Sequence, residues 1–389
     1  MEETSCERMM LGARMKAAVA PRTVHTVDCC GLEGSPAAAQ HRIVETGPLL
    51  ENGRLREAGW ALSPVLEYRR DCIAASAWRI KEWDYYLIQD AHYAVAITVS
   101  DLAYLGLLSA SVLDFETGLF ITESVITPMP FGRYRMPESS DSGSIDYECK
   151  QVGVHIATEN GRRTFKLRYD GFVDGKTLAL DAVLDDEPRD SMVIATPWAE
   201  NDKAFYYNRK IIGMRAEGEF SIGGNSHRFS RDDALGLLDW GRGVWTYDNT
   251  WFWAAAQGWQ SDSCGIAHRV GFNFGYGFGD TSAASENMVF VDGEATKIGR
   301  LDFGIPAVDG AYSLMDPWHF VDAEGRIDLE FVPDIDRTDY SHVGPVLTDQ
   351  HQVFGVYSGT VVVDGPDGCP CTVPVDGLRG FAEVVHNKY

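Results

Sequence analysis

Polar and apolar residues alternate along three consecutive stretches between residues 152 and 184, and turn-forming pairs separate the stretches. Asn160-Gly161 stands between the first two, and Asp174-Gly175 stands between the second and the third. A two-residue hairpin turn needs positive φ at both central positions, which Asn-Gly and Asp-Gly accept more readily than most pairs. The pattern therefore predicts three antiparallel strands in succession.

The same alternation recurs along the rest of the chain. Asp292-Gly293 separates two further alternating runs, and the stretches 326–336 and 351–363 also read as strands. Residues 91–115 begin with β-branched side chains and lack helix caps, which favours a pair of strands over a helix. Many antiparallel strands with little helix predict an all-β fold of two lipocalin-like antiparallel β-barrels or sandwiches, with few short helices.

The best helix signal is short and lies near the middle of the chain. Ser230 fits an N-cap, Asp233 can complete a capping box, and the helix is expected to end near Asp239. A chain of 389 residues is longer than one core usually serves, so two domains are expected. The predicted organisation is a poorly ordered extension at 1–42, an N-terminal lipocalin-like domain at 43–228 and a C-terminal one at 229–389.

The charge balance excludes some partners. The formal net charge is −23, from 34 basic and 57 acidic residues, and we therefore expect no nucleic-acid partner. No apolar run approaches the roughly 18–20 residues of a membrane span. The eight cysteines are scattered as free thiols would be, which favours a cytoplasmic location. No phosphate-binding loop or zinc-binding histidine pair occurs, so we expect no metal and no cofactor.

Five of the ten tryptophans lie between residues 235 and 259, together with Asp239 and Arg242. Aromatic residues at this density form either a crowded core or the wall of an apolar cavity with a few polar groups. A carboxylic acid desolvated among tryptophans becomes a usable proton donor, so Asp239 is the candidate catalytic residue. The alternative is that Asp239 and Arg242 pair with each other and only fix a turn.

A strand with a glycine face follows the tryptophan-rich segment. Glycines alternate with aromatic residues between residues 271 and 279. Such a face is weak unless a large group packs against it, and the simplest partner is the tryptophan face of the preceding strand.

Further candidates for substrate binding come from alternation in other stretches. Asp84 shares one face of the run 80–88 with Glu82 and Tyr86, and these side chains line either a polar pocket or the surface. Glu286 and Asn287 point to opposite faces, so only one of them faces inward, and a solvated turn is the alternative. The predicted substrate-binding residues are Trp240, Arg242, Trp245, Tyr247, Trp251, Asn287, Glu286, Asp84 and Tyr207.

Several spaced motifs resemble a family of bacterial and fungal proteins catalogued as a domain of unknown function, over about residues 43–389. The motifs are GWALSPVLEYRR (59–70), IKEWDYYLI (80–88), FYYNRKI (205–211), DWGRGVW (239–245), ENMVFVDGEATKIG (286–299), DLEFVP (328–333) and GFAEVVHNKY (380–389). That family is distantly similar to the two-barrel lipocalin-like group, which includes the carotenoid hydratases (hydroxyneurosporene synthase) and fungal cyclases of the Diels–Alderase type. The resemblance implies a hydrophobic substrate between two barrels and carries over no catalytic residue.

Three functional hypotheses follow. In the first, the protein is a hydratase, isomerase or cyclase in which Asp239 protonates a double bond, tryptophans stabilise the resulting cation, and Tyr207 and Asn287 orient substrate or water. In the second, it binds a lipid or aromatic metabolite without catalysis. In the third, it acts on a carbohydrate, which would need two carboxyl groups at a defined separation. The expected partner in the first two is a hydrophobic small-molecule ligand.

Overall fold

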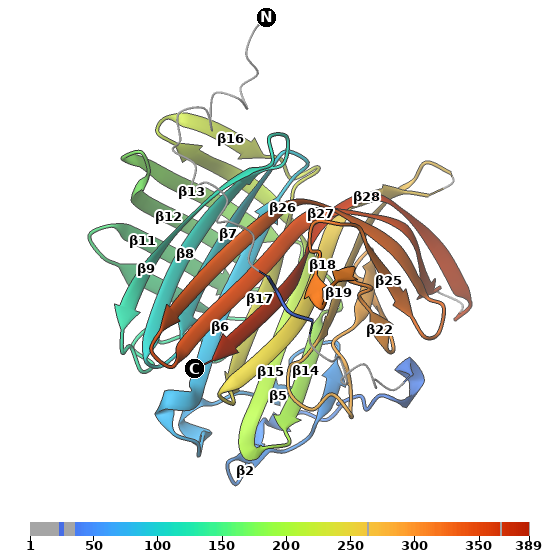
Figure 1. The fold of residues 1–389 in the computed structure, drawn as a ribbon, viewed down its shortest axis with the longest axis horizontal. Helices are drawn as coiled ribbons and strands as arrows, with labels where there is room; N and C mark the ends of the chain where they lie inside the picture. The colour runs from blue at the N-terminus through green and yellow to red at the C-terminus, as the bar shows by residue number, and fades with distance from the viewer. Residues whose placement is uncertain (1–22, 27–35, 263, 366–367, 389) are drawn as a thin grey trace, which may run out of the picture.

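Two large antiparallel sheets dominate the computed structural model, which describes residues 23–26, 36–262, 264–365 and 368–388. The first sheet has 13 strands and the second has 9. Figure 1 shows the two curled sheets side by side, the first in blue to yellow and the second in gold to red. The predicted all-β fold with two lipocalin-like halves is confirmed.

The first sheet has the core order β10-β11-β12-β13-β15-β17-β6-β7-β8-β9, with β14, β16 and β4 attached at its side. Its strands are β4 (Gly59–Ala61), β6 (Ile80–Gln89), β7 (Tyr93–Asp101), β8 (Leu105–Asp114), β9 (Leu119–Pro128), β10 (Gly143–Glu148), β11 (Val152–Glu159), β12 (Arg162–Val173), β13 (Lys176–Asp185), β14 (Met192–Trp198), β15 (Asn201–Ile222), β16 (Asn225–Phe229) and β17 (Leu235–Val244).

The second sheet has the order β21-β20-β19-β18-β28-β27-β26-β25-β22. Its strands are β18 (Asp248–Ser261), β19 (Ala267–Tyr276), β20 (Met288–Val291), β21 (Glu294–Lys297), β22 (Leu301–Asp302), β25 (Trp318–Asp322), β26 (Ile327–Val343), β27 (Val346–Asp364) and β28 (Pro370–Lys388).

Short elements complete the described chain. Three strand pairs are formed by β1 (Gly47–Pro48) with β5 (Leu66–Glu67), β2 (Leu50–Glu51) with β3 (Arg54–Leu55), and β23 (Ala307–Val308) with β24 (Ala311–Tyr312). The 3-10 turns are η1 (Ala37–Ala39), η2 (Arg70–Cys72) and η3 (Ala77–Arg79).

The hairpins predicted from Asn-Gly and Asp-Gly pairs are present. Asn160 and Gly161 have φ of 53° and 74° and connect β11 to β12. Asp174 and Gly175 have φ of 48° and 74° and connect β12 to β13. Both positions of each turn thus lie in the left-handed region that these residue types tolerate. The predicted meander is confirmed.

The predicted helix from Ser230 to Asp239 is wrong. Residues 231–233 form a turn, in which the amide of Asp232 donates to the hydroxyl of Ser230, and β17 begins at Leu235. β17 pairs with β15 on one side and β6 on the other, and all ten of its residues are buried. A strand buried on both faces has no polar alternation to distinguish it from a short helix, and pairing with two neighbours overrides the local capping signal.

One core cluster lies within the second sheet, and the other joins the first sheet to second-sheet residues such as Trp253, Phe354 and Phe381. The two sheets contact each other where β15 meets β18 and β19 and where β9 meets β26. The chain leaves the first sheet after Val244 and joins the second at Asp248. The predicted division at 228/229 therefore precedes β17, which pairs within the first sheet. The division into two domains stays a prediction.

The predicted N-terminal extension is described only in part. Residues 1–22 and 27–35 lie outside the described residues. At its end, the side-chain carbonyl of Gln40 accepts a hydrogen bond from the amide of Ser285, which ties this segment to the second half of the chain.

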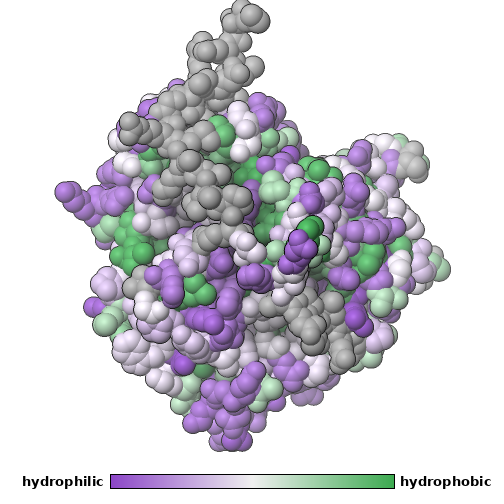
Figure 2. All heavy atoms as spheres, in the orientation of Figure 1, coloured by the Kyte–Doolittle hydropathy of each residue, from purple (hydrophilic) through white to green (hydrophobic). Residues whose placement is uncertain are grey.

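No helix in the described ranges has the length and apolar character needed to cross a bilayer. On the face shown in Figure 2, hydrophilic side chains surround small hydrophobic patches. The cytoplasmic location stays a prediction.

Candidate functional site

Adjacent strands bring polar side chains into one row on the face of the first sheet that meets the second sheet. Lys210 of β15, Asp239 of β17 and Tyr85 of β6 are direct cross-strand neighbours. Asn208 and Trp83 flank Gly241 in the next row along the strands. Residues opposite each other in an antiparallel sheet share a face, so these five side chains project toward the second sheet.

Asp239 accepts three hydrogen-bonding or ion-pair contacts. The amide of Asn208 donates to its Oδ1 over 2.6 Å, and the indole N–H of Trp83 donates to its Oδ2 over 3.3 Å. The ammonium of Lys210 lies 3.4 Å from Oδ1. The Asp239 side chain keeps 10% exposure, whereas that of Lys210 keeps 1%. Of these two residues, Asp239 is therefore the more accessible to solvent.

The second sheet supplies another carboxylate to the same lysine. Glu286 lies just before β20, and its Oε2 is 3.1 Å from the Lys210 ammonium. The amide of Asn273 donates to the same Oε2 over 3.2 Å. The Oε1 of Glu286 is buried and has no hydrogen-bond partner among the described residues. One buried acceptor in the cluster therefore remains open to a donor.

The Lys210 ammonium also lies among aromatic rings. It is 4.6 Å from the Trp253 ring centre and 5.4 Å from that of Phe278, and it donates to the Tyr206 hydroxyl over 3.1 Å. Burial alone lowers the pKa of a lysine, but the negative charges of Asp239 and Glu286 outweigh burial, so the pKa of Lys210 lies above its usual value. The lysine is thus a fixed positive charge between two carboxylates.

A third carboxyl group faces the cluster, and it also comes from the second sheet. Glu383 of β28 is a cross-strand neighbour of Trp253, and its Oε1 accepts a hydrogen bond from the Gln352 amide over 2.6 Å. Burial raises the pKa of Glu383 to about 8, although Arg337 acts in the opposite direction. The junction of the sheets therefore holds three carboxyl groups and one ammonium.

Glycines in the DWGRGVW segment make room for indole rings. A Cβ atom at Gly241 would lie 2.0 Å from Cζ2 of Trp83, so only glycine allows that ring to lie over β17 and reach Asp239. Trp253 lies directly opposite Gly275 in the register, but the side chain that comes closest to Gly275 is that of Glu286. The packing of a tryptophan ring over the glycine face of β19 stays a prediction. The aromatic residues of β19 itself face away, into the second core.

Of the predicted site residues, the structure brings four together at the junction. Asp239 and Glu286 share Lys210. The Trp245 ring centre lies 5.6 Å from that of Trp83 and 5.3 Å from that of Trp251, so these rings form a wall beside Asp239. Trp83 and Trp251 are only partly buried, and the wall therefore has an accessible edge.

Four other predicted residues lie on the opposite face of the first sheet. Trp240 follows Asp239 in β17 and points the other way, as successive strand residues do. Arg242 pairs with Asp84, with 2.9 Å between the guanidinium and Oδ1, and its guanidinium lies 4.2 Å from the Trp240 ring centre. The Tyr207 hydroxyl donates to the backbone carbonyl of Leu66. The pair of Asp239 with Arg242 is therefore absent, and Arg242 ties β17 to β6 instead.

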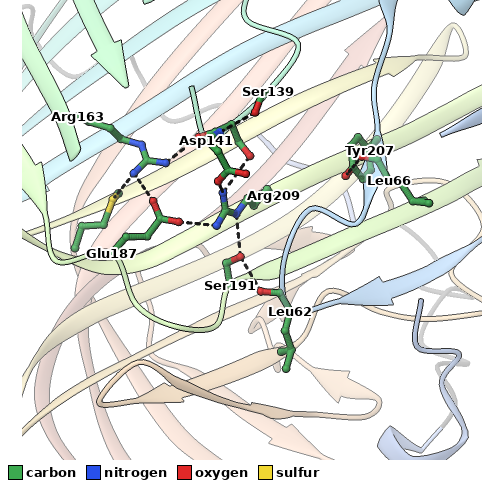
Figure 3. Close-up of polar contacts among 11 residues, drawn as sticks. Leu62, Leu66, Ser139, Asp141, Arg163, Glu187, Ser191, Tyr207 and Arg209 are labelled. Atoms are coloured by element: carbon green, nitrogen blue, oxygen red, sulfur yellow. Dashed lines mark hydrogen bonds and ion pairs between the residues drawn. The ribbon is translucent and has the colours of Figure 1, made fainter. Parts of the chain in front are cut away.

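Figure 3 shows a neighbouring network on that opposite face, with Tyr207 at its side. Arg163 and Arg209 both bind Glu187, over 2.7 and 2.6 Å. The Nε of Arg209 also donates to the Ser191 hydroxyl, which donates to the backbone of Leu62. These contacts join β12, β15 and the loops around them, so we assign the network a structural role.

Asn287 and Tyr247 have contacts elsewhere. Asn287 bonds the amide of Gly275 and the carbonyl of Gly299, which fixes the approach to β20. Tyr247 is 42% exposed, and its hydroxyl donates to the carbonyl of Pro345 in the turn between β26 and β27.

A surface groove of about 390 Å³ lies away from the junction. It is lined by Asp146, Tyr147, Glu148, Gly153, Val154, His155, Lys166, Leu167 and Arg168. None of the predicted site residues lines it.

Sequence reasoning missed Lys210 and Glu383. Alternation along β15 places Lys210 with Tyr206 and Asn208, a face that reads equally well as surface. No signal near Glu383 distinguishes it, because its partners come from strands far away in sequence.

Comparison with known proteins gives one family and several distant structures. The comparison with curated proteins gives no match. Kievitone hydratase from Nectria haematococca is 12% identical, with a TM-score of 0.46 over 79% of this chain and 88% of that one. A putative AttH protein from Nitrosomonas europaea is 12% identical, with a TM-score of 0.48 over 87% and 98%. CghA is 10% identical, with a TM-score of 0.41 over 90% and 97%.

One family model matches most of the chain. The model of a domain of unknown function, DUF2804, matches residues 40–389, which include Lys210, Asp239, Glu286 and Glu383. The chain belongs to the DUF2804 family.

Proposed function

We propose that this protein binds a hydrophobic small molecule at the junction of its two sheets and acts on it by acid–base chemistry, as a hydratase, isomerase or cyclase. The observation that carries the proposal is the junction cluster, defined as Lys210, Asp239, Glu286 and Glu383. Buried ionisable groups are costly to maintain, and they are concentrated where a protein performs chemistry.

Asp239 is the proposed catalytic carboxylate. It accepts contacts from Asn208, Trp83 and Lys210, which stabilise negative charge on its oxygens. That arrangement suits a group that orients a water molecule or accepts a proton better than one that donates a proton. This role replaces the proton donation expected from the sequence.

The aromatic wall supplies what an apolar ligand needs. Trp83, Trp245 and Trp251 present ring surface beside Asp239, and each ring can stabilise a developing cation by about 0.5–2 kcal/mol. The unpartnered Oε1 of Glu286 can accept a hydrogen bond from a ligand hydroxyl or from water. An unsaturated, mostly apolar molecule with one polar group matches this combination.

The test begins with natively purified protein. Bound small molecules are extracted and identified by mass spectrometry, and the compound and its hydrated or dehydrated forms are then incubated with the enzyme. We expect turnover by the wild type and at least a hundredfold lower turnover by Asp239→Asn, on the order of a lost acid–base group. His155→Ala, in the surface groove, is the matched control and should keep full turnover.

A ligand that is retained but never converted would support the non-catalytic binding hypothesis instead. Full turnover by Asp239→Asn would remove the role given to Asp239.

A further inference from the structure

Glu383 differs from the other two carboxyl groups of the junction cluster in its partners. Asp239 and Glu286 each lie within 3.4 Å of the Lys210 ammonium. Among the residues that the structure describes, no ion pair includes Glu383, and its hydrogen-bond donors are two neutral groups, the amide of Gln352 and the indole of Trp251. A buried carboxylate without a cation is costly, so the neutral acid is the favoured form there.

Side chains from several strands of both sheets act on this carboxyl group. Gln352 comes from β27 and also donates to the Tyr85 hydroxyl of β6 over 3.3 Å. The charged or hydrogen-bonding groups that act on Glu383 are Arg337 from β26, Asp239 from β17, Lys210 from β15 and Trp251 from β18. Asp239 opposes ionisation of Glu383, while Lys210 and Arg337 favour it, and burial is the largest influence.

Asp239 and Glu383 therefore form a pair with divided roles. Asp239 accepts three contacts that stabilise negative charge, one of them from an ammonium. Glu383 is buried, has no ion-pair partner among the described residues and accepts its hydrogen bonds from neutral groups. Environments that separate two titratable groups in this way define an acid and a base at one site.

We infer that Glu383 is the proton donor of the junction cluster and that its substrate is a hydrophobic molecule with a carbon–carbon double bond. This inference rests on the proposed function. The O–H bond of Glu383 breaks as the π electrons of the double bond form a new C–H bond, which leaves a carbocation beside the tryptophan wall. In a hydratase, water forms the C–O bond and passes a proton to Asp239. In an isomerase, the neighbouring carbon passes its proton to Asp239. Proton exchange with solvent restores both carboxyl groups.

The test is infrared difference spectroscopy on the intact, ligand-free protein. Wild type minus Glu383→Gln should show the carbonyl band of a protonated carboxyl group at pH 7, and the band should disappear as the pH rises through about 8. Asp239→Asn and His155→Ala are the matched controls and should keep the band. Absence of the band from the difference spectrum at pH 7 would overturn the inference.

A second variant keeps the test decisive if Glu383→Gln does not fold. Glu383→Asp retains the titrating group, and its band should be shifted in frequency relative to that of wild type; an identical spectrum would overturn the inference. If wild-type protein lacks the band but still binds its ligand, the role of Glu383 as proton donor is refuted and the proposed function is not. If wild-type protein shows the band but binds no ligand and has no turnover, the proposed function is refuted and the protonated state of Glu383 is not.

Discussion

At the residue scale, two carboxylates from different sheets share one buried ammonium group. Lys210 and Asp239 come from the first sheet, and Glu286 comes from the second. The Lys210–Glu286 contact therefore crosses the junction. An ion pair of this kind is weak evidence for stability as a whole, but removal of one member leaves uncompensated buried charge.

We predict that Lys210→Met lowers the free energy of unfolding by about 3–5 kcal/mol, because two buried carboxylates lose their cation. The measurement is chemical denaturation at pH 7. The control is the triple variant Lys210→Met, Asp239→Asn, Glu286→Gln, which removes all three charges and should recover most of the loss. A single variant as stable as wild type would show that the carboxylates do not need the lysine.

We predict that the stability of the folded protein falls as the pH rises, because the pKa of Glu383 is higher in the folded protein than in the unfolded chain. Its pKa is about 8 in the folded protein and near 4.5 in the unfolded chain, so the folded state binds more protons between these values. The stability from this group is complete below pH 4.5 and is lost as the pH rises toward 8, by up to about 1.4 kcal/mol per unit.

Urea denaturation at pH 5, 6, 7 and 8 measures this slope. Wild type should lose stability relative to Glu383→Gln over that range, since the amide does not titrate. Equal slopes for the two proteins would show that Glu383 is ionised when folded.

The residues of the junction show how far sequence reasoning extends. Asp239 and Glu286 could be singled out from aromatic or turn-rich surroundings, but their shared partner could not. Which side chains meet depends on the register of β15, β17 and β6 and on how the second sheet packs against them. Alternation fixes the faces of one strand and does not determine which face meets another sheet.

At the element scale, β17 shows where local signals fail. Its sequence carries a helix cap followed by apolar residues, and the pairing of β15 and β6 along both edges makes it a central strand. The hairpins were predictable because two adjacent residues determine a turn. A central strand depends on two distant neighbours, and those are not visible in a short window.

We predict that Gly241→Ala destabilises the protein by about 1–3 kcal/mol, because the new methyl group overlaps the Trp83 ring. It should also release the indole from Asp239, which a change in tryptophan fluorescence would report. Thermal unfolding measures the loss of stability. In a Trp83→Ala background the same substitution should cost much less, and an unchanged cost there would mean that Trp83 is not the obstacle.

At the scale of the whole molecule, the two sheets contribute different side chains to their junction. The first contributes Lys210 and Asp239 from the strands at its centre, and the second contributes Glu286, Glu383 and Trp253. The all-β class and the two halves follow from the alternation and the turns. The junction depends on tertiary packing alone. The sequence therefore predicts an aromatic segment around Asp239, but it does not predict that Glu383 comes to the same junction.

The place where an apolar ligand binds tests the central claim most directly. The measurement is photolabelling of the intact protein with an apolar diazirine probe, with and without excess extracted ligand, followed by peptide mass spectrometry. We predict ligand-competed labels on peptides that contain Trp83 or Trp251, at the accessible edge of the junction. Competed labels confined to residues 146–168, in the surface groove, would contradict the claim.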